Sequence, residues 1–202
     1  EIYTLSLHDA LPIFDSLKHE STVFYIEKAE ENESLKEDIR VGMRMFEELL
    51  GYRPKQFTPG AGNYSPALHG VLKEEGIDYI NVQRYFPYPL GDGKYVKKFL
   101  ANGKKNEEGQ KYVVRNCAFE PYWDNCKRND NAVAGCLENV TAAFRMHAPA
   151  IISTHRVNFV GSLEASHRDD SLQQLKSLLQ EITKRWPDVE FMDGTQMCDK
   201  VF

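Results

Sequence analysis

Residues 149–159, with the sequence PAIISTHRVNF, constrain the fold more than any other stretch of the chain. Pro149 ends a segment of helical periodicity at residues 131–146, and residues 150–153 form the short apolar run that is typical of a buried strand. In folds that alternate strands and helices, the side chains at the carboxyl ends of the strands line the ligand crevice. His155 comes directly after such a strand and is therefore the first candidate for a catalytic residue.

Two further polar side chains follow His155 within three residues. Arg156 supplies a fixed cation and Asn158 an amide, and neither is needed for apolar packing. We predict that both contact a substrate. A histidine at a strand end can also be an ordinary hydrogen-bonded residue, and that alternative stays open at this stage.

The first half of the chain alternates helix and strand. Ser34 and Glu37 form a capping box for a helix at residues 34–50, and residues 55–58 follow as a short strand. Ser65 caps a second helix, which ends before a strand at residues 77–80. This rhythm predicts an α/β fold with a parallel sheet.

The second half continues with less regular spacing. Its expected elements are strands at 95–101, 111–119, 150–153 and 189–192, and helices at 131–146, from Asp169 or Asp170 to Pro187, and over the last ten residues.

Two other segments add candidate substrate-binding residues. The loop at residues 59–66 is rich in small residues that let a backbone approach a ligand, and it contains Asn63 and Tyr64. Arg115, Asn116 and Glu120 gather where the strand at residues 111–119 ends. The alternative for these three is a surface ion pair with a turn asparagine.

Bulk composition narrows the function classes. The chain has 202 residues, 42% of them hydrophobic and 27% charged, which suits one soluble domain. The net charge of -5 with scattered basic residues argues against nucleic acid as a partner. No apolar run approaches the roughly 20 residues that span a bilayer. The four cysteines lack metal-ligand spacing, and free buried thiols are expected.

Residues 1–13, EIYTLSLHDALPI, resemble the in-frame translation of a common sequencing adapter. We therefore expect the protein sequence proper to cover residues 14–202, with its native upstream part replaced.

Three stretches resemble one family. Residues 46–68, 111–121 and 149–192 are similar to the carboxyl-terminal half of bacterial NodB-type polysaccharide deacetylases, which belong to the glycoside hydrolase/deacetylase barrels. The resemblance covers nearly all of residues 34–197. It implies an incomplete (β/α) barrel from a hydrolase that removes acetyl groups from the amino sugars of a polysaccharide or oligosaccharide substrate.

The resemblance also implies site chemistry. In such deacetylases a divalent metal polarises the acetyl carbonyl, an aspartate acts as base and a histidine protonates the leaving amine; His155 matches that acid. Thr58 stands where the family has arginine. The family's upstream Asp-Asp motif and paired histidines are missing here. No metal site and no cofactor are therefore expected in this chain, which we predict to be inactive, and a zinc-like metal is expected only in the intact parent.

Two alternatives remain beside the deacetylase. One is a non-catalytic carbohydrate-binding barrel. The other is a glycosidase on a related barrel, which needs two carboxylates roughly 5–10 Å apart, with Glu120 as one of them. Several aromatic side chains would suit sugar stacking under any of these functions: Tyr64, Tyr85, Phe86, Tyr88, Tyr122 and Trp123. A barrel without its first strands is expected to be marginally stable, with a broad thermal transition.

Overall fold

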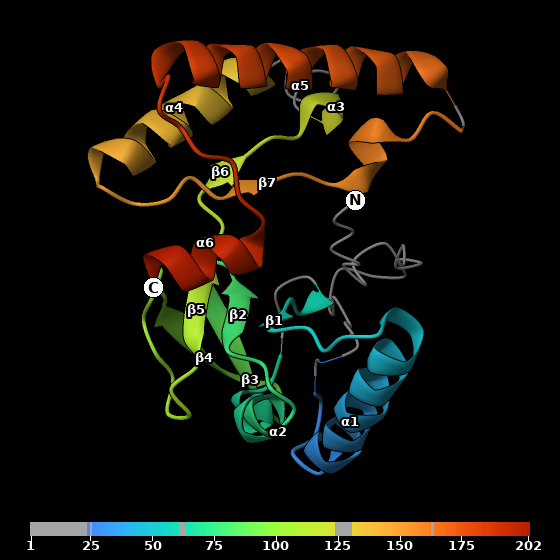
Figure 1. The fold of residues 1–202 in the computed structure, drawn as a ribbon. Helices are drawn as coiled ribbons and strands as arrows, with labels where there is room; N and C mark the ends of the chain where they lie inside the picture. Colours follow the sequence, from blue (N-terminus) through green and yellow to red (C-terminus); the bar gives the residue numbers. More distant parts are fainter. Residues whose placement is uncertain (1–23, 25, 61–63, 124–130, 163) are drawn as a thin grey trace. The chain divides into compact units, whose positions relative to one another are not determined.

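A computed structural model describes residues 24, 26–60, 64–123, 131–162 and 164–202 (Figure 1). Among them the chain forms two compact units. The first unit comprises the described residues up to Val114 together with Asp193–Phe202, and the second comprises those of Arg115–Met192. Each unit has its own hydrophobic core, so each is described by itself.

A parallel sheet forms the centre of the first unit. Its strands are β1 (Gln56–Phe57), β2 (Tyr79–Val82) and β5 (Lys111–Val114), in the order β1-β2-β5. Both pairs are parallel, as the alternation of helix and strand predicted. The sheet is apolar where it faces the core, with Ile80 and Val82 fully buried.

Helix α1 (Glu31–Leu50) packs its apolar stripe of Leu35, Ile39 and Met43 into this core. Gly51 ends it in a left-handed conformation at φ 76°, which glycine adopts without strain. The predicted capping box is wrong. Ser34 lies inside the helix and its hydroxyl donates to the carbonyl of Glu31 over 2.9 Å, because the helix starts three residues earlier.

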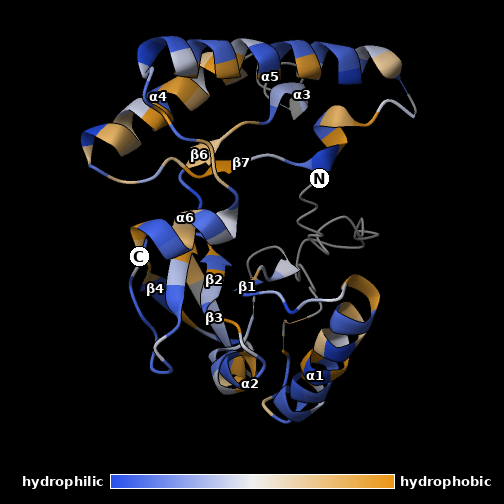
Figure 2. Ribbon diagram, viewed as in Figure 1, coloured by the Kyte–Doolittle hydropathy of each residue, from blue (hydrophilic) through white to orange (hydrophobic). Residues whose placement is uncertain are grey.

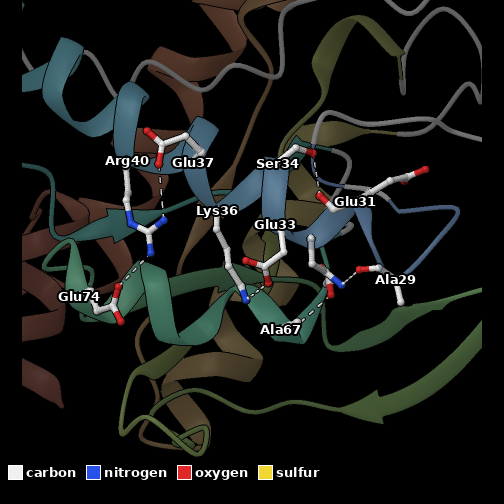
Figure 3. A network of polar contacts seen from close by, with 11 residues as sticks. Ala29, Glu31, Glu33, Ser34, Lys36, Glu37, Arg40, Ala67 and Glu74 are labelled. Carbon is white, nitrogen blue, oxygen red and sulfur yellow. Dashed lines mark hydrogen bonds and ion pairs between the residues drawn. The ribbon is translucent and has the colours of Figure 1, made fainter.

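Polar contacts connect α1 with α2 (His69–Glu74), which follows the short helix η3 (Pro66–Leu68). Arg40 reaches Glu74 at 3.4 Å and Glu37 at 3.6 Å (Figure 3). These pairs are exposed, so each adds well under about 1 kcal/mol. Ser65 caps η3 as predicted, with its hydroxyl accepting from the amide of Ala67.

Strands β3 (Tyr85–Gly91) and β4 (Lys94–Phe99) form an antiparallel hairpin. Only the second strand was predicted. Pro87 and Pro89 interrupt the first, and proline usually marks the absence of a strand because it has no N–H to donate. A two-stranded ribbon tolerates them because, among the described residues, each of its strands has a ladder partner on one edge only.

The carboxyl-terminal helix α6 (Gly194–Val201) returns to the first unit. Asp193 caps it through a capping box with Gln196. The hydroxyl of Tyr79 on β2 donates to Asp199 over 2.8 Å. The predicted closing helix is confirmed, and polar contacts to the sheet hold it.

The second unit contains a short parallel pair, β6 (Cys117–Ala118) and β7 (Ile152–Ser153). The single strand predicted at residues 111–119 is wrong, since it breaks at Arg115 and Asn116 into β5 and β6, which belong to different sheets. The apolar residues before the break therefore pack in the core of the first unit, and those after it pack in the core of the second.

Two helices cover this pair, α4 (Ala132–Arg145) and α5 (Ala165–Arg185). Helix α4 is the more apolar of the two, whereas α5 is mostly hydrophilic with an apolar stripe (Figure 2). They meet through buried residues of each helix: Leu137 and Val140, Leu178 and Ile182. Helix α4 was predicted correctly.

Other predictions for this unit need correction. Helix α5 begins at Ala165, so neither Asp169 nor Asp170 caps it. The strand predicted at residues 189–192 is wrong, since these residues belong to none of the sheets that the described part of the chain forms. Burial raises the pKa of the Cys117 thiol to about 11 and that of Cys136 to about 12, which keeps both protonated at neutral pH.

The described residues form a mixed α/β structure with three small sheets and no closed barrel. Within this part of the chain, no helix has the length and apolar character that a membrane crossing requires.

Candidate functional site

Glu120 and His155 come together at the carboxyl ends of two parallel strands. Glu120 follows β6, and His155 follows β7. Because the strands are parallel and in register, both ends lie on the same edge. His155 Nδ1 lies 2.6 Å from Glu120 Oε1. The histidine predicted from the apolar-strand pattern therefore has a carboxylate as its partner.

Asn158 hydrogen-bonds through its side chain to both members of this pair. It lies on the short helix η5 (Arg156–Phe159) and its side chain is only 1% exposed. Its Nδ2 donates to Glu120 Oε2 over 2.6 Å and to the carbonyl of His155 over 2.9 Å. Its Oδ1 accepts from the amide of Tyr122 over 3.1 Å. The amide thus fixes the orientation of the carboxylate.

These contacts orient the side chains of His155 and Glu120. The amide nitrogen of Asn158 donates to one oxygen of Glu120, and His155 Nδ1 lies within hydrogen-bond distance of the other. His155 Nδ1 is thus the ring nitrogen that faces the carboxylate, and Nε2 lies on the other side of the imidazole. The imidazole is exposed while the carboxylate is half-buried. The imidazole of His155 is therefore the more accessible member of the pair, and the carboxylate of Glu120 the less accessible one.

Arg115 adds a cation close to Glu120. Its guanidinium donates to the Ser153 hydroxyl on β7 over 3.2 Å. Burial lowers the pKa of Arg115, and the charge of Glu120 opposes that shift. Arginine keeps its charge under these conditions, so Glu120 lies near a fixed positive group.

A second histidine extends the site at Tyr122, on the short helix α3 (Pro121–Trp123). The rings of Tyr122 and His167 lie 4.6 Å apart between centroids. His167 Nε2 pairs with Glu164 at 3.1 Å. Sequence reasoning named Tyr122 as a sugar-stacking aromatic but missed Glu164 and His167, although their i,i+3 spacing at the start of α5 was a usable signal.

The remaining predicted site residues have other positions and contacts, and one of them lies outside the described residues. Arg156 is exposed on η5 beside His155. Asn116 spans the two strands, donating to the carbonyl of Pro149 over 2.9 Å and accepting from the amide of Ile151 over 2.7 Å. Tyr64 is fully buried in the first unit, and Asn63 lies outside the described residues.

Thr58, which occupies the place of the deacetylase arginine, accepts from Asn81 Nδ2 over 2.7 Å in the first unit. Across the described ranges, no three histidine, cysteine, aspartate or glutamate side chains lie together as metal ligands would.

Comparison with protein families identifies the chain. The model of glycosyl hydrolase family 57 matches residues 6–122, which is more than half of the 202 residues. The chain belongs to glycosyl hydrolase family 57. The resemblance to NodB-type polysaccharide deacetylases was therefore wrong as a family assignment. Apolar strands that end in a polar residue recur in many barrels, so that pattern alone did not separate the two families.

The match includes the part of the site that carries Glu120, and it ends at Tyr122. His155 and Asn158 lie beyond the matched range and join the site through their contacts to Glu120. Membership of a glycosyl hydrolase family makes this chain part of a carbohydrate-active hydrolase family. No curated protein and no solved structure matches the chain.

Proposed function

We propose that this chain is part of a glycoside hydrolase, and that Glu120 is one of the two carboxylates that act on the glycosidic bond. The observation that carries the proposal is that both oxygens of Glu120 are in hydrogen-bond contact. Oε1 lies 2.6 Å from His155 Nδ1, and Oε2 lies 2.6 Å from Asn158 Nδ2. The family match, which includes Glu120, supports it.

The hydrogen bonds support one role for this carboxylate. We assign Glu120 the role of the anionic carboxylate, because an ionised carboxylate can accept from both Asn158 and His155. In a retaining reaction one oxygen attacks the anomeric carbon as the second carboxyl group protonates the leaving oxygen. In an inverting reaction Glu120 takes a proton from the attacking water.

The neighbouring side chains support this role without entering the bond changes. Asn158 and His155 fix the direction of the Glu120 oxygens. Arg115 stabilises the negative charge of Glu120, and Arg156, exposed beside His155, is positioned to contact sugar hydroxyl groups. We assign Tyr122 to stacking against a sugar ring, because its side chain is half-buried and borders the Glu120 network.

The proposed substrate is a polysaccharide or oligosaccharide. Two carboxyl groups complete glycosidic hydrolysis between them, so the reaction needs no metal and no organic cofactor. We further propose that the parallel pair of β6 and β7 is part of a (β/α)7 barrel of the kind found in the family. In such a barrel the ends of β6 and β7 would lie on the catalytic face.

The test compares two glutamates that make the same contact. Glu107 pairs with His69 Nδ1 at 2.6 Å in the first unit, as Glu120 does with His155 in the second. We expect Glu120→Gln to lower the hydrolysis of aryl glycosides and oligosaccharides at least about a hundredfold, and Glu107→Gln to leave turnover unchanged.

A trapping reagent gives a second measurement. An activated 2-deoxy-2-fluoro glycoside forms a stable ester with a carboxylate nucleophile, and peptide mass mapping locates that ester. Label on Glu120 supports the retaining role. Full activity in Glu120→Gln would refute the proposal, and glycan binding without hydrolysis in the unmodified chain would favour a non-catalytic carbohydrate-binding barrel.

A further inference from the structure

The β3–β4 hairpin separates its side chains into two faces. Tyr85 pairs with Phe99 across the two strands, and Pro89 pairs with Tyr95. Residues two apart along a strand point to the same side. Tyr85, Tyr95, Lys97 and Phe99 therefore share one face of the hairpin.

The opposite face is the one that packs on the core. Phe86 and Tyr88 are both buried and belong to the hydrophobic cluster of the first unit. Lys98 pairs with Phe86 and lies 5.6 Å from the centre of the Tyr88 ring, on that same side. The face with Tyr85, Tyr95, Lys97 and Phe99 consequently points outward, and we call it the hairpin platform.

The platform exposes more aromatic surface than a packed sheet requires. Tyr85 is 74% exposed, Phe99 54% and Tyr95 47%. The rings of Tyr85 and Phe99 meet edge to face with centroids 5.5 Å apart. Tyr95 and Phe99 are four residues apart on one strand, a separation of about 14 Å. The exposed Tyr85–Phe99 pair, with Tyr95 further along the same face, indicates a binding surface.

The charge on this hairpin is opposite to that of the whole chain. Strand β4 has the sequence KYVKKF, with three lysines and no acidic residue, whereas the chain carries a net charge of -5. Lys97 lies between Tyr95 and Phe99 on the outward face. A local positive field beside exposed rings attracts an extended anionic ligand.

We infer that the hairpin platform binds an acidic polysaccharide whose sugars carry carboxylate groups. Tyr95 and the Tyr85–Phe99 pair stack on the apolar faces of sugar rings, and Lys97 pairs with a carboxylate between them. The choice of a carbohydrate rests on the proposed function in a glycosyl hydrolase family. The platform belongs to the first unit and Glu120 to the second, so binding and hydrolysis are separable properties.

The experiment measures binding of the full chain to polygalacturonate and to a neutral glucan of matched length by titration calorimetry. Tyr85→Ala removes one ring and Lys97→Gln removes the cation. Tyr52→Ala is the matched control, because Tyr52 is 56% exposed and also meets a phenylalanine ring edge-on, that of Phe46 at 5.3 Å. Circular dichroism confirms that each variant is folded.

We expect Tyr85→Ala and Lys97→Gln each to weaken polygalacturonate binding about fivefold to tenfold, with Tyr52→Ala unchanged. Added salt should weaken the binding, and the neutral glucan should bind less tightly. Equal affinity for both glycans, insensitivity to Lys97→Gln, or no binding to either would overturn the inference. A dimer that Tyr85→Ala dissociates would also overturn it, because a second copy would then be the occupant.

The Glu120→Gln variant separates the two proposals. Unchanged polygalacturonate binding in this variant supports a platform that acts apart from hydrolysis. If Glu120→Gln kept full hydrolytic activity, the proposed function would fail while platform binding could still be measured. If Glu120-dependent hydrolysis persisted without any platform binding, only the present inference would fail.

Discussion

Glu120 Oε1 and His155 Nδ1 lie 2.6 Å apart although 35 residues separate them in the sequence. The contact exists because β6 and β7 are parallel neighbours, so residues that follow them reach the same edge of the pair. Asn158 completes the arrangement by holding the second oxygen of Glu120. The carboxylate is thus fixed by two side chains from one segment, and its environment can be tested one group at a time.

The first prediction concerns Asn158→Asp, which keeps the size of the side chain but turns an oxygen toward Glu120. At pH 7 both carboxylates are ionised and repel each other, so we expect a loss of about 1–3 kcal/mol in the free energy of unfolding. In acid the two share a proton and the loss should shrink. Urea unfolding at neutral and acidic pH measures the difference.

Asn81→Asp is the control for this variant. Asn81 donates to the hydroxyl of Thr58, which can rotate and donate in return to a carboxylate. Its stability loss should therefore be small and should vary little with pH. An equal loss for Asn158→Asp at both pH values would show that like-charge repulsion is not the cause.

The second prediction concerns the pH dependence of the Glu107–His69 contact. Burial raises the pKa of Glu107, but the hydrogen bond from His69 and a backbone hydrogen bond outweigh it, and the pKa falls below its ordinary value of 4.5. The folded state therefore favours the ionised carboxylate. This contribution to stability is present above pH 4.5 and is lost as the pH falls through the lowered pKa.

Glu107→Gln should consequently destabilise the chain at neutral pH and lose its effect in acid. Because the carboxylate is largely exposed, the loss at pH 7 should stay below about 1 kcal/mol. Urea unfolding of both proteins across the acid range provides the measurement. A difference that grew as the pH fell would contradict the assigned sign.

The third prediction concerns unfolding of the two compact units. Trp186 packs edge-on against Phe144 with ring centroids 5.0 Å apart, so its fluorescence reports on the second unit. In a Trp123→Phe background Trp186 is the remaining tryptophan. We expect its thermal transition and that of the far-ultraviolet circular dichroism to differ in midpoint, giving a broad overall transition. Coincident sharp transitions would argue against independent units and against a barrel with open edges.

Local signals in the sequence determined the elements that depend on near neighbours. Helix α4 has its cap at Asn131 and its apolar stripe within one segment, so periodicity located it. Gly51 marked the end of α1 for a similar reason. Glu120 and His155 were recognised as polar residues after apolar runs, which is also a local pattern.

Elements that depend on distant partners were not predictable in this way. Strand β3 contains two prolines and forms only because β4 lies beside it. The stretch at residues 111–119 was predicted as one strand. Its polar residues Arg115 and Asn116 mark the break, but they do not show that β5 and β6 belong to different sheets. The strand expected at residues 189–192 has the right composition, but these residues join no sheet among the described residues.

The sequence by itself determined which residues could carry chemistry, because residue type and the end of an apolar run can both be read locally. Only the tertiary structure decided which of them work together. Parallel pairing of β6 and β7 brings Glu120 next to His155, and the buried Asn158 contacts both. Tyr64, by contrast, is buried in the core of the other unit. Those outcomes depend on contacts between residues far apart in the chain, and no local pattern encodes such contacts.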